Sequence, residues 1–106
     1  IMLGGEHTCT LGAFRAVQEK YSNVSILQLD AHADLRQEYE GNPLSHASVM
    51  ARINELEPKI AQLGIRALSK EEADEIYRNE RIRTVFGHEV DEQNWQAKLL
   101  AHLTDE

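Results

Sequence analysis

Hydrophobic and polar positions follow two alternating periods along the chain. Short, mainly apolar runs lie at residues 1–5, 24–30, 59–68 and 82–87, and they are typical of strands buried on both faces of a parallel sheet. Residues 10–21, 45–56, 69–77 and 89–103 carry apolar side chains three and four positions apart, which is the spacing of one helix face. This repeated strand–helix order predicts βαβ units.

Polar residues mark the expected starts of two helices. Ser45 follows a polar loop at residues 37–44 and is expected to cap the helix that runs to Leu56. Ser69 and Glu72 have the spacing of a capping box at the start of the next helix. Both helices are therefore predicted to begin at a serine.

The predicted architecture is α/β, with a parallel sheet and helices on both of its faces. The sequence shows no internal repeat and no interdomain linker, so residues 1–106 are expected to form a single domain. The chain begins on an apolar run without an initiator Met and stops without a tail, which indicates a partial domain truncated at both ends. In such sheets, ligands bind beyond the carboxyl ends of the strands.

Composition and charge narrow the choice of partners. The net charge is −7, from 11 Lys and Arg against 18 Asp and Glu, which argues against nucleic acid or an anionic membrane and is compatible with a cationic ligand. No apolar stretch approaches the roughly 20 residues that span a bilayer. The single Cys9 excludes an internal disulfide, so a cytoplasmic location is expected.

Chemistry-bearing side chains gather at the ends of the first two predicted strands. Asp30, His32 and Asp34 alternate with two alanines directly after the apolar run at 24–30. In extended backbone, side chains two apart point the same way, so these three are expected to converge. His7 follows the first run in "GGEHT" and is expected to reach the same edge from a neighbouring strand.

Converging carboxylates and imidazoles would repel and desolvate one another unless a cation lay among them. Each pattern alone is also typical of a solvated turn or of a capping histidine, but their occurrence on consecutive strands favours a metal site. Mixed oxygen and nitrogen ligands without thiolate favour Mn²⁺, Fe²⁺ or Zn²⁺. We therefore predict His7, Asp30, His32 and Asp34 as metal ligands.

The segments "GGEHT", "LDAHADLR" and "GNPLSHA" together resemble the ureohydrolase family, which includes arginases and agmatinases. The resemblance implies a three-layer αβα fold of the arginase/deacetylase type and two Mn²⁺ ions per subunit in the complete protein. It implies that a hydroxide bridging the metals attacks a guanidinium carbon and releases urea. By this resemblance His7 and Asp34 bind one metal, His32 binds the other, and Asp30 is a catalytic carboxylate bridging both.

The resemblance also assigns His46 a role. It stands where the family carries a histidine credited with proton transfer, and imidazole has a suitable pKa for protonating a leaving amine. Its other interpretation is a first-turn helix residue without a chemical role. The family's third motif, a D-x-D pair that completes both metal shells, does not occur in residues 1–106, so the fragment alone is expected to be inactive.

The substrate prediction comes from two comparisons within the family. Ala67 and Ser69 stand where arginases carry Asp, and the loop at 36–48 resembles that of agmatinases. Agmatine, hydrolysed to putrescine and urea in polyamine biosynthesis, is therefore favoured over arginine or guanidinobutyrate. The family also implies a homo-oligomer, a trimer or hexamer. A non-catalytic binding or assembly module, or a metal-dependent deacetylase, remains an alternative.

Overall fold

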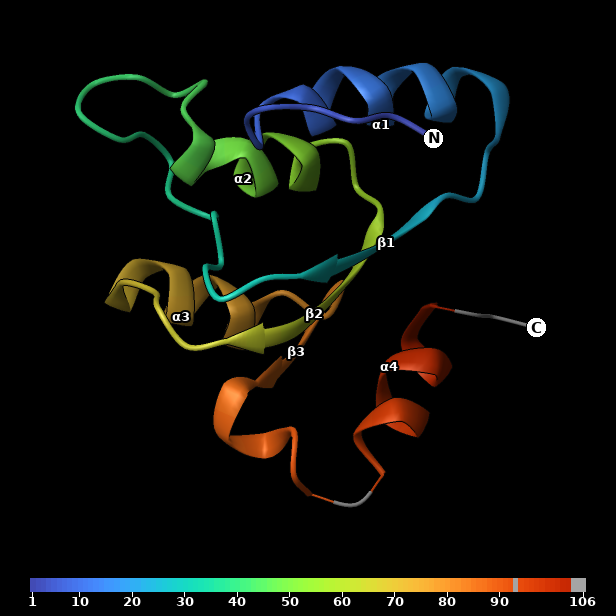
Figure 1. The fold of residues 1–106 in the computed structure, drawn as a ribbon, viewed down its shortest axis with the longest axis vertical. Coiled ribbons are helices and arrows are strands. Elements are labelled where there is room, and N and C mark those ends of the chain that lie inside the picture. Colours follow the sequence, from blue (N-terminus) through green and yellow to red (C-terminus); the bar gives the residue numbers. More distant parts are fainter. Residues whose placement is uncertain (93, 104–106) are drawn as a thin grey trace.

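The computed structural model describes residues 1–92 and 94–103. Its helices and strands follow one another in the order helix, strand, helix, strand, helix, strand, helix (Figure 1). Two single 3₁₀ turns lie at His46–Ser48 and Gly87–Glu89. The elements are α1 (Cys9–Lys20), β1 (Ser25–Leu29), α2 (Val49–Asn54), β2 (Lys59–Ile65), α3 (Lys70–Arg78), β3 (Ile82–Phe86) and α4 (Trp95–Leu103).

The described strands form one parallel sheet in the order β1-β2-β3. Ser25 pairs with Lys59 at the start of β1 and β2, and Ile60 pairs with Ile82 across β2 and β3. This confirms the predicted parallel sheet. The strand expected at residues 1–5 is wrong for this structure, because that segment is hydrogen-bonded to neither edge strand and lies largely exposed to solvent.

Helices cover both faces of the sheet, as predicted (Figure 1). On one face, Phe14 of α1 and Ile53 of α2 belong to the same buried cluster as Ile60 of β2, and α3 adds Ile76 to it. On the other face, Leu99 of α4 packs in a smaller cluster with Ala61, Val85 and their neighbours. The sequence therefore forms two apolar layers around a central β2.

The two predicted serine caps have different outcomes. The Ser69–Glu72 capping box is confirmed, since Ser69 Oγ accepts from the Glu72 amide and the Glu72 side chain accepts from the Ser69 amide. Ser45 makes no side-chain cap bond, and its hydroxyl donates to Ser48 Oγ at 3.3 Å. The expected helix at 45–56 is instead a 3₁₀ turn followed by α2.

The last predicted helix, at 89–103, is also shorter than expected. A 3₁₀ turn ends at Glu89 and α4 begins at Trp95, while Gln93 between them lies outside the described residues. Across the described part of the chain, every helix is too short or too polar to cross a bilayer.

Gly64 brings the end of β2 close to the end of β1. Its φ of +92° lies in the region that favours glycine, and an added Cβ would stand 3.3 Å from the Asp30 carbonyl oxygen. Beyond this irregularity, the amides of Arg66 and Ala67 both donate to the Ala31 carbonyl, at 2.8 and 2.9 Å. The chain after β1 is therefore fixed to the chain after β2, where the site lies.

Candidate metal centre

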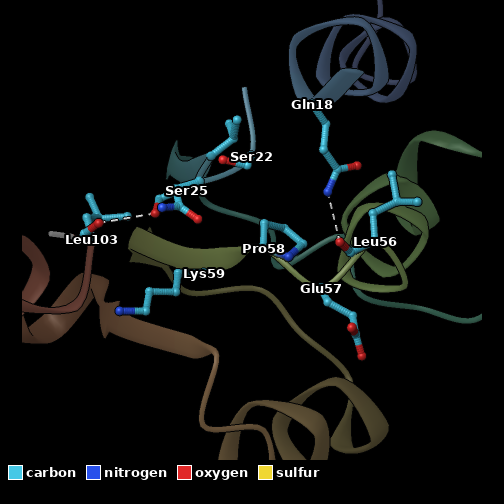
Figure 2. A pocket seen from close by; sticks show the side chains of 10 residues that line it. Gln18, Ser22, Ser25, Leu56, Glu57, Pro58, Lys59 and Leu103 are labelled. Carbon is cyan, nitrogen blue, oxygen red and sulfur yellow. Dashed lines mark hydrogen bonds between the residues drawn. The ribbon is translucent and has the colours of Figure 1, made fainter. Parts of the chain in front are cut away.

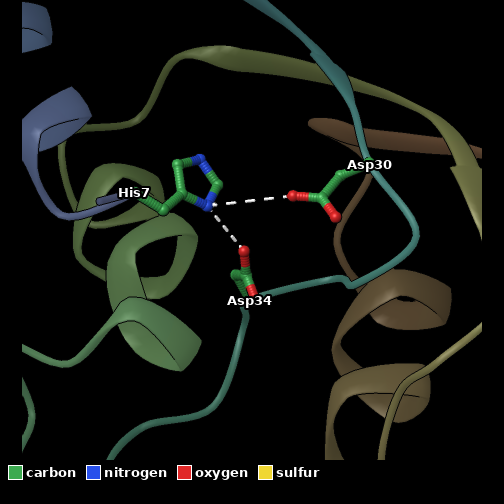
Figure 3. Close-up of side chains that lie close together, drawn as sticks. All are labelled: His7, Asp30 and Asp34. Atoms are coloured by element: carbon green, nitrogen blue, oxygen red, sulfur yellow. Dashed lines mark hydrogen bonds and ion pairs between the residues drawn. The ribbon is translucent and has the colours of Figure 1, made fainter. Parts of the chain in front are cut away.

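Two separate segments, the turn before α1 and the loop after β1, meet at the carboxyl edge of β1. His7 lies in the turn before α1, Asp30 directly follows β1, and Asp34 lies four residues further on (Figure 3). His7 Nδ1 is 2.7 Å from Asp34 Oδ2 and 3.8 Å from Asp30 Oδ2. The imidazole thus lies between two carboxylates of the loop that follows β1.

The backbone of Asp34 explains where its carboxylate points. Its φ of +54° is uncommon for a residue with a side chain, although aspartate tolerates this region better than most. The turn directs its carbonyl at the start of α2, where the amides of Met50 and Ala51 donate to it at 2.9 and 3.2 Å. Amides in a first helical turn need such acceptors, so α2 fixes the orientation of Asp34.

Asp30 is held by hydrogen bonds from its own loop and from β1. The His32 amide donates to Asp30 Oδ1 at 2.9 Å, and Gln28 Nε2 donates to Oδ2 at 3.5 Å. Burial alone would raise the pKa of Asp30, but these bonds and the nearby His7 outweigh it and lower that pKa. The group is therefore kept as a carboxylate.

The same carboxylates act on His7. The hydrogen bond to Asp34 raises the pKa of the His7 imidazole above its ordinary value, burial opposes this, and the charges of Asp34 and Asp30 raise it further. Two anionic oxygens directed at one imidazole create a negative potential at the site. Such a site attracts cations.

His32 and His46 border this cluster. His32 Nδ1 lies 3.3 Å from Asp30 Oδ1, and its side chain is 67 % exposed. His46 is in the 3₁₀ turn before α2, and its ring meets the Tyr39 ring edge-on with centroids 5.5 Å apart. Both histidines line the same pocket as His7, Asp30 and Asp34.

The donor set fits a divalent cation. Ligand atoms of His7, Asp30 and Asp34 all lie within 4.8 Å of one another. One imidazole with two carboxylates is a donor combination that suits Mn²⁺, Fe²⁺ or Zn²⁺. His32 lies against the other oxygen of Asp30 and is not part of this group of three.

Comparison of the sequence with known proteins identifies the family to which this chain belongs. The model of the family described as "Arginase family" matches residues 1–106. The chain belongs to the arginase family. It is 38 % identical over 106 residues to the N(1)-aminopropylagmatine ureohydrolase of Synechocystis sp., covering 98 % of this chain and 34 % of that protein.

Two further arginase-family comparisons agree. The chain is 42 % identical to the agmatinase of Bacillus cereus over 72 residues, which are 66 % of this chain and 25 % of that protein. It superposes on the agmatine ureohydrolase of Thermoplasma volcanium with a TM-score of 0.77 and 36 % identity, covering 92 % of this chain and 32 % of that one. The chain thus spans about a third or less of the length of these relatives.

The predicted geometry of this arginase-family site was wrong in two places. β1 ends at Leu29, so residues 30–34 are not one continuous strand, and Asp34 turns through a positive φ. His7 stands in a turn, not at a strand tip. Asp30 and Asp34 nevertheless converge on His7, and Ala33 between them is completely buried.

Sequence reasoning missed two polar residues behind the site. The sequence pattern indicates Gln28 only as part of an apolar strand, and Glu72 only as a helix cap. Glu72 is 3 % exposed, and its carboxylate also accepts from the Leu35 amide at 3.0 Å. The available signal was a polar side chain at a strand position expected to be buried, which needs a hydrogen-bond partner.

A second opening lies at the opposite edge of the arginase-family sheet (Figure 2). Ser25 and Lys59, which begin β1 and β2, line it together with residues 56–58, which follow α2. Two of its polar side chains bond to backbone: Gln18 Nε2 donates to the Leu56 carbonyl, and Ser25 Oγ donates to the Leu103 carbonyl. Among the described residues that line this opening, Glu57 is the single acid. This donor set does not suit a metal site.

Proposed function

We propose that the full-length protein is a manganese-dependent ureohydrolase that releases urea from agmatine. The observation that carries this proposal is the convergence of His7, Asp30 and Asp34, with ligand atoms within 4.8 Å of one another, in an arginase-family chain. The complete protein would hold two Mn²⁺ ions per subunit. His7 and Asp34 would bind one ion, His32 would bind the other, and Asp30 would contribute to both. When bound, the two ions would supply an activated water for attack on the guanidinium carbon.

The proposed site needs ligands beyond residues 1–106. Residues 1–106 offer four candidate ligands, namely His7, Asp30, Asp34 and the exposed His32. Four side chains are too few for a tight site of two ions. The relatives are about three times as long as the matched segment. We propose that the remaining ligands come from sequence outside this segment, which makes residues 1–106 one partial domain of the enzyme.

Residues of this chain bind and orient a cationic substrate. The pocket is lined by Glu6, Asp30, Asp34 and Glu72, so its potential favours a guanidinium. His46 lines the same pocket, and its ring packs edge-on against the Tyr39 ring. We assign His46 the transfer of a proton to the leaving amine, because an imidazole can both accept and donate a proton.

The contacts of Ser69 favour agmatine over arginine. Its hydroxyl already accepts from the Glu72 amide in the capping box, and its amide donates to the Glu72 carboxylate. Ala67, which lines the pocket, offers no polar side chain to an amino-acid head group. A substrate without an α-carboxylate needs no polar contact from positions 67 and 69. Hydrolysis of agmatine would place the enzyme in polyamine biosynthesis.

The test is urea release by the full-length protein loaded with Mn²⁺. Agmatine, N(1)-aminopropylagmatine, arginine and 4-guanidinobutyrate are compared by kcat/KM, with an acetylated polyamine as the control for deacetylase activity. We expect agmatine to be the best substrate, and His46→Asn to lower kcat by about 10²- to 10⁴-fold. Acetate release without urea from any guanidino compound would contradict the proposal. A non-catalytic protein would release neither.

The family resemblance also supports a homo-oligomer, proposed as a trimer or hexamer. Light scattering on the full-length protein would measure its mass in solution. A monomer at micromolar concentration would contradict this part of the proposal.

A further inference from the structure

A row of polar side chains crosses the sheet directly behind the metal centre. Gln28 of β1 pairs in register with Gln62 of β2, which pairs in register with Thr84 of β3. We call these three residues the amide row. Gln28 is 6 % exposed and Gln62 is completely buried. The preceding row on the same face, Ile26, Ile60 and Ile82, is apolar and belongs to the core.

The amide row is connected from end to end by hydrogen bonds. Thr84 Oγ1 donates to Gln62 Oε1 at 2.8 Å, and Gln62 Nε2 donates to Gln28 Oε1 at 2.7 Å. Gln28 Nε2 then donates to the Asp30 carboxylate and, at 3.1 Å, to the His32 carbonyl. One chain of donors therefore runs from β3 to the loop that carries the metal ligands.

The second amide proton of Gln62 also reaches that loop. Gln62 Nε2 donates to the Ala33 carbonyl at 3.0 Å, from a side chain two strand positions before Gly64. The amide row thus contacts the loop at Asp30, His32 and Ala33, which lie between β1 and the left-handed turn of Asp34. Both amides use both of their protons, and each amide oxygen accepts one bond.

The acceptors fix the direction of the row. Two backbone carbonyls and a carboxylate lie at the loop end, so both amides must turn their nitrogen toward the loop. Each amide oxygen then faces β3 and needs a donor, which Gln62 supplies to Gln28 and Thr84 supplies to Gln62. Flipping either amide would place oxygen against oxygen.

Folding stability alone does not require this arrangement. Burying amides in an apolar sheet face is unfavourable unless every group is paired, and apolar side chains of the same volume would fill the space without that requirement. Fully satisfied buried networks do fix a single geometry. Metal sites depend on such second partners, which orient the ligands.

We infer that Gln28, Gln62 and Thr84 are positioning residues that set the orientation of Asp30 and of the His32–Ala33 backbone for divalent-cation binding. This inference rests on the proposed function, because it assumes that Asp30 and His32 bind metal. It adds to that proposal a set of residues that touch neither metal nor substrate.

The test is Mn²⁺ binding by the full-length protein, followed by electron paramagnetic resonance. Gln62→Met keeps the volume and removes the hydrogen bonds, and we expect it to weaken Mn²⁺ binding by about ten- to a hundredfold. The bound-Mn²⁺ spectrum should also change, because Asp30 would no longer hold one orientation. Ile60→Val, in the neighbouring apolar row, is the control: it should lower the melting temperature and leave affinity and spectrum unchanged.

A second pair of variants covers the case in which Gln62→Met does not fold. Thr84→Val removes only the terminal hydroxyl and should weaken Mn²⁺ binding in the same direction, whereas Thr84→Ser keeps the hydroxyl and should bind as the wild type does. Wild-type affinity and spectrum in Thr84→Val and in any folded Gln62→Met would overturn the inference while the proposed function stands. A wild-type protein that binds no Mn²⁺ would overturn both.

Discussion

The carboxylate of Glu72 lies beneath the loop that carries Asp30 and Asp34. It is 3 % exposed and accepts from the amides of Ser69 and Leu35, at 2.6 and 3.0 Å. The Arg36 guanidinium stands 3.8 Å away. One side chain thus begins α3 and also anchors the segment after Asp34, so the structure of the site and the start of a helix depend on the same group.

Glu72→Gln should destabilise the protein by about 1–3 kcal/mol, because an amide NH₂ would face backbone amides that need acceptors. The matched control is Glu71→Gln, one residue earlier and exposed, which should change the free energy of unfolding by less than about 0.5 kcal/mol. Urea-induced unfolding of both variants measures the difference. Equal stability of the two would show that the buried carboxylate has no such role.

At the scale of elements, the helix periods and the strands at 24–30, 59–68 and 82–87 could be predicted, because apolar spacing directly reports which faces are buried. The run at 1–5 shows the limit of that reasoning: apolar character alone does not make a strand, which also needs a hydrogen-bonding neighbour. Likewise Ser45 has the residue type of a cap, but its hydroxyl bonds to Ser48 and the Asp34 carbonyl serves the first amides of α2.

Gly64 is the element-scale feature that brings β2 against the end of β1. Gly64→Ala should cost more than about 1 kcal/mol, because alanine disfavours its positive φ and the new methyl group would press on the Asp30 carbonyl. Gly12→Ala, in α1 with open space around the added methyl, should instead stabilise by roughly 0.5–1 kcal/mol. Thermal unfolding of the two variants should therefore shift in opposite directions. A shift in the same direction would contradict this explanation.

Glu75 connects α2 and α3 and predicts a pH dependence. Burial would raise its pKa, but hydrogen bonds from Asn79, Arg78 and Asn54 lower it overall. A carboxyl group with a lowered pKa in the folded state stabilises at neutral pH, and this contribution is lost as the pH falls below about 4.5, the ordinary glutamate value. Glu75→Gln should flatten the loss of stability on acidification, measured by unfolding at several acidic pH values. An unchanged dependence of the unfolding free energy on pH in Glu75→Gln would contradict the role assigned to Glu75. Asp74→Asn, at an exposed position on the same helix, is the control and should keep the wild-type dependence.

At the scale of the whole molecule, the proposed ligands come from two chain segments, the turn before α1 and the loop after β1. The sequence predicted their identity from the motifs, but not the turn of Asp34 or the place of His7 outside the sheet. The turn of Asp34 depends on hydrogen bonds that form only in the folded chain, from the Met50 and Ala51 amides to the Asp34 carbonyl. The amide row was equally hidden, because a single glutamine in a strand gives no sign of the partner it will meet.

A cation that joins these two segments should stabilise the entire fold. At a free Mn²⁺ concentration about 100 times the dissociation constant, the unfolding free energy should rise by about 2.7 kcal/mol. Calorimetric melting of the full-length protein with Mn²⁺, and again after chelation, measures this change. Asp34→Asn should remove most of the increase, and an increase retained in that variant would place the binding elsewhere.

The most direct test of the metal centre is a calorimetric titration of the metal-free, full-length protein with Mn²⁺. The wild type should bind, and Asp30→Asn should weaken binding by at least about tenfold, because this carboxylate lies between His7 and His32. Asp74→Asn, an exposed acid on α3, should bind as the wild type does. Equal affinity for Mn²⁺ in the wild type and in Asp30→Asn would contradict the assignment of this cluster as the metal centre.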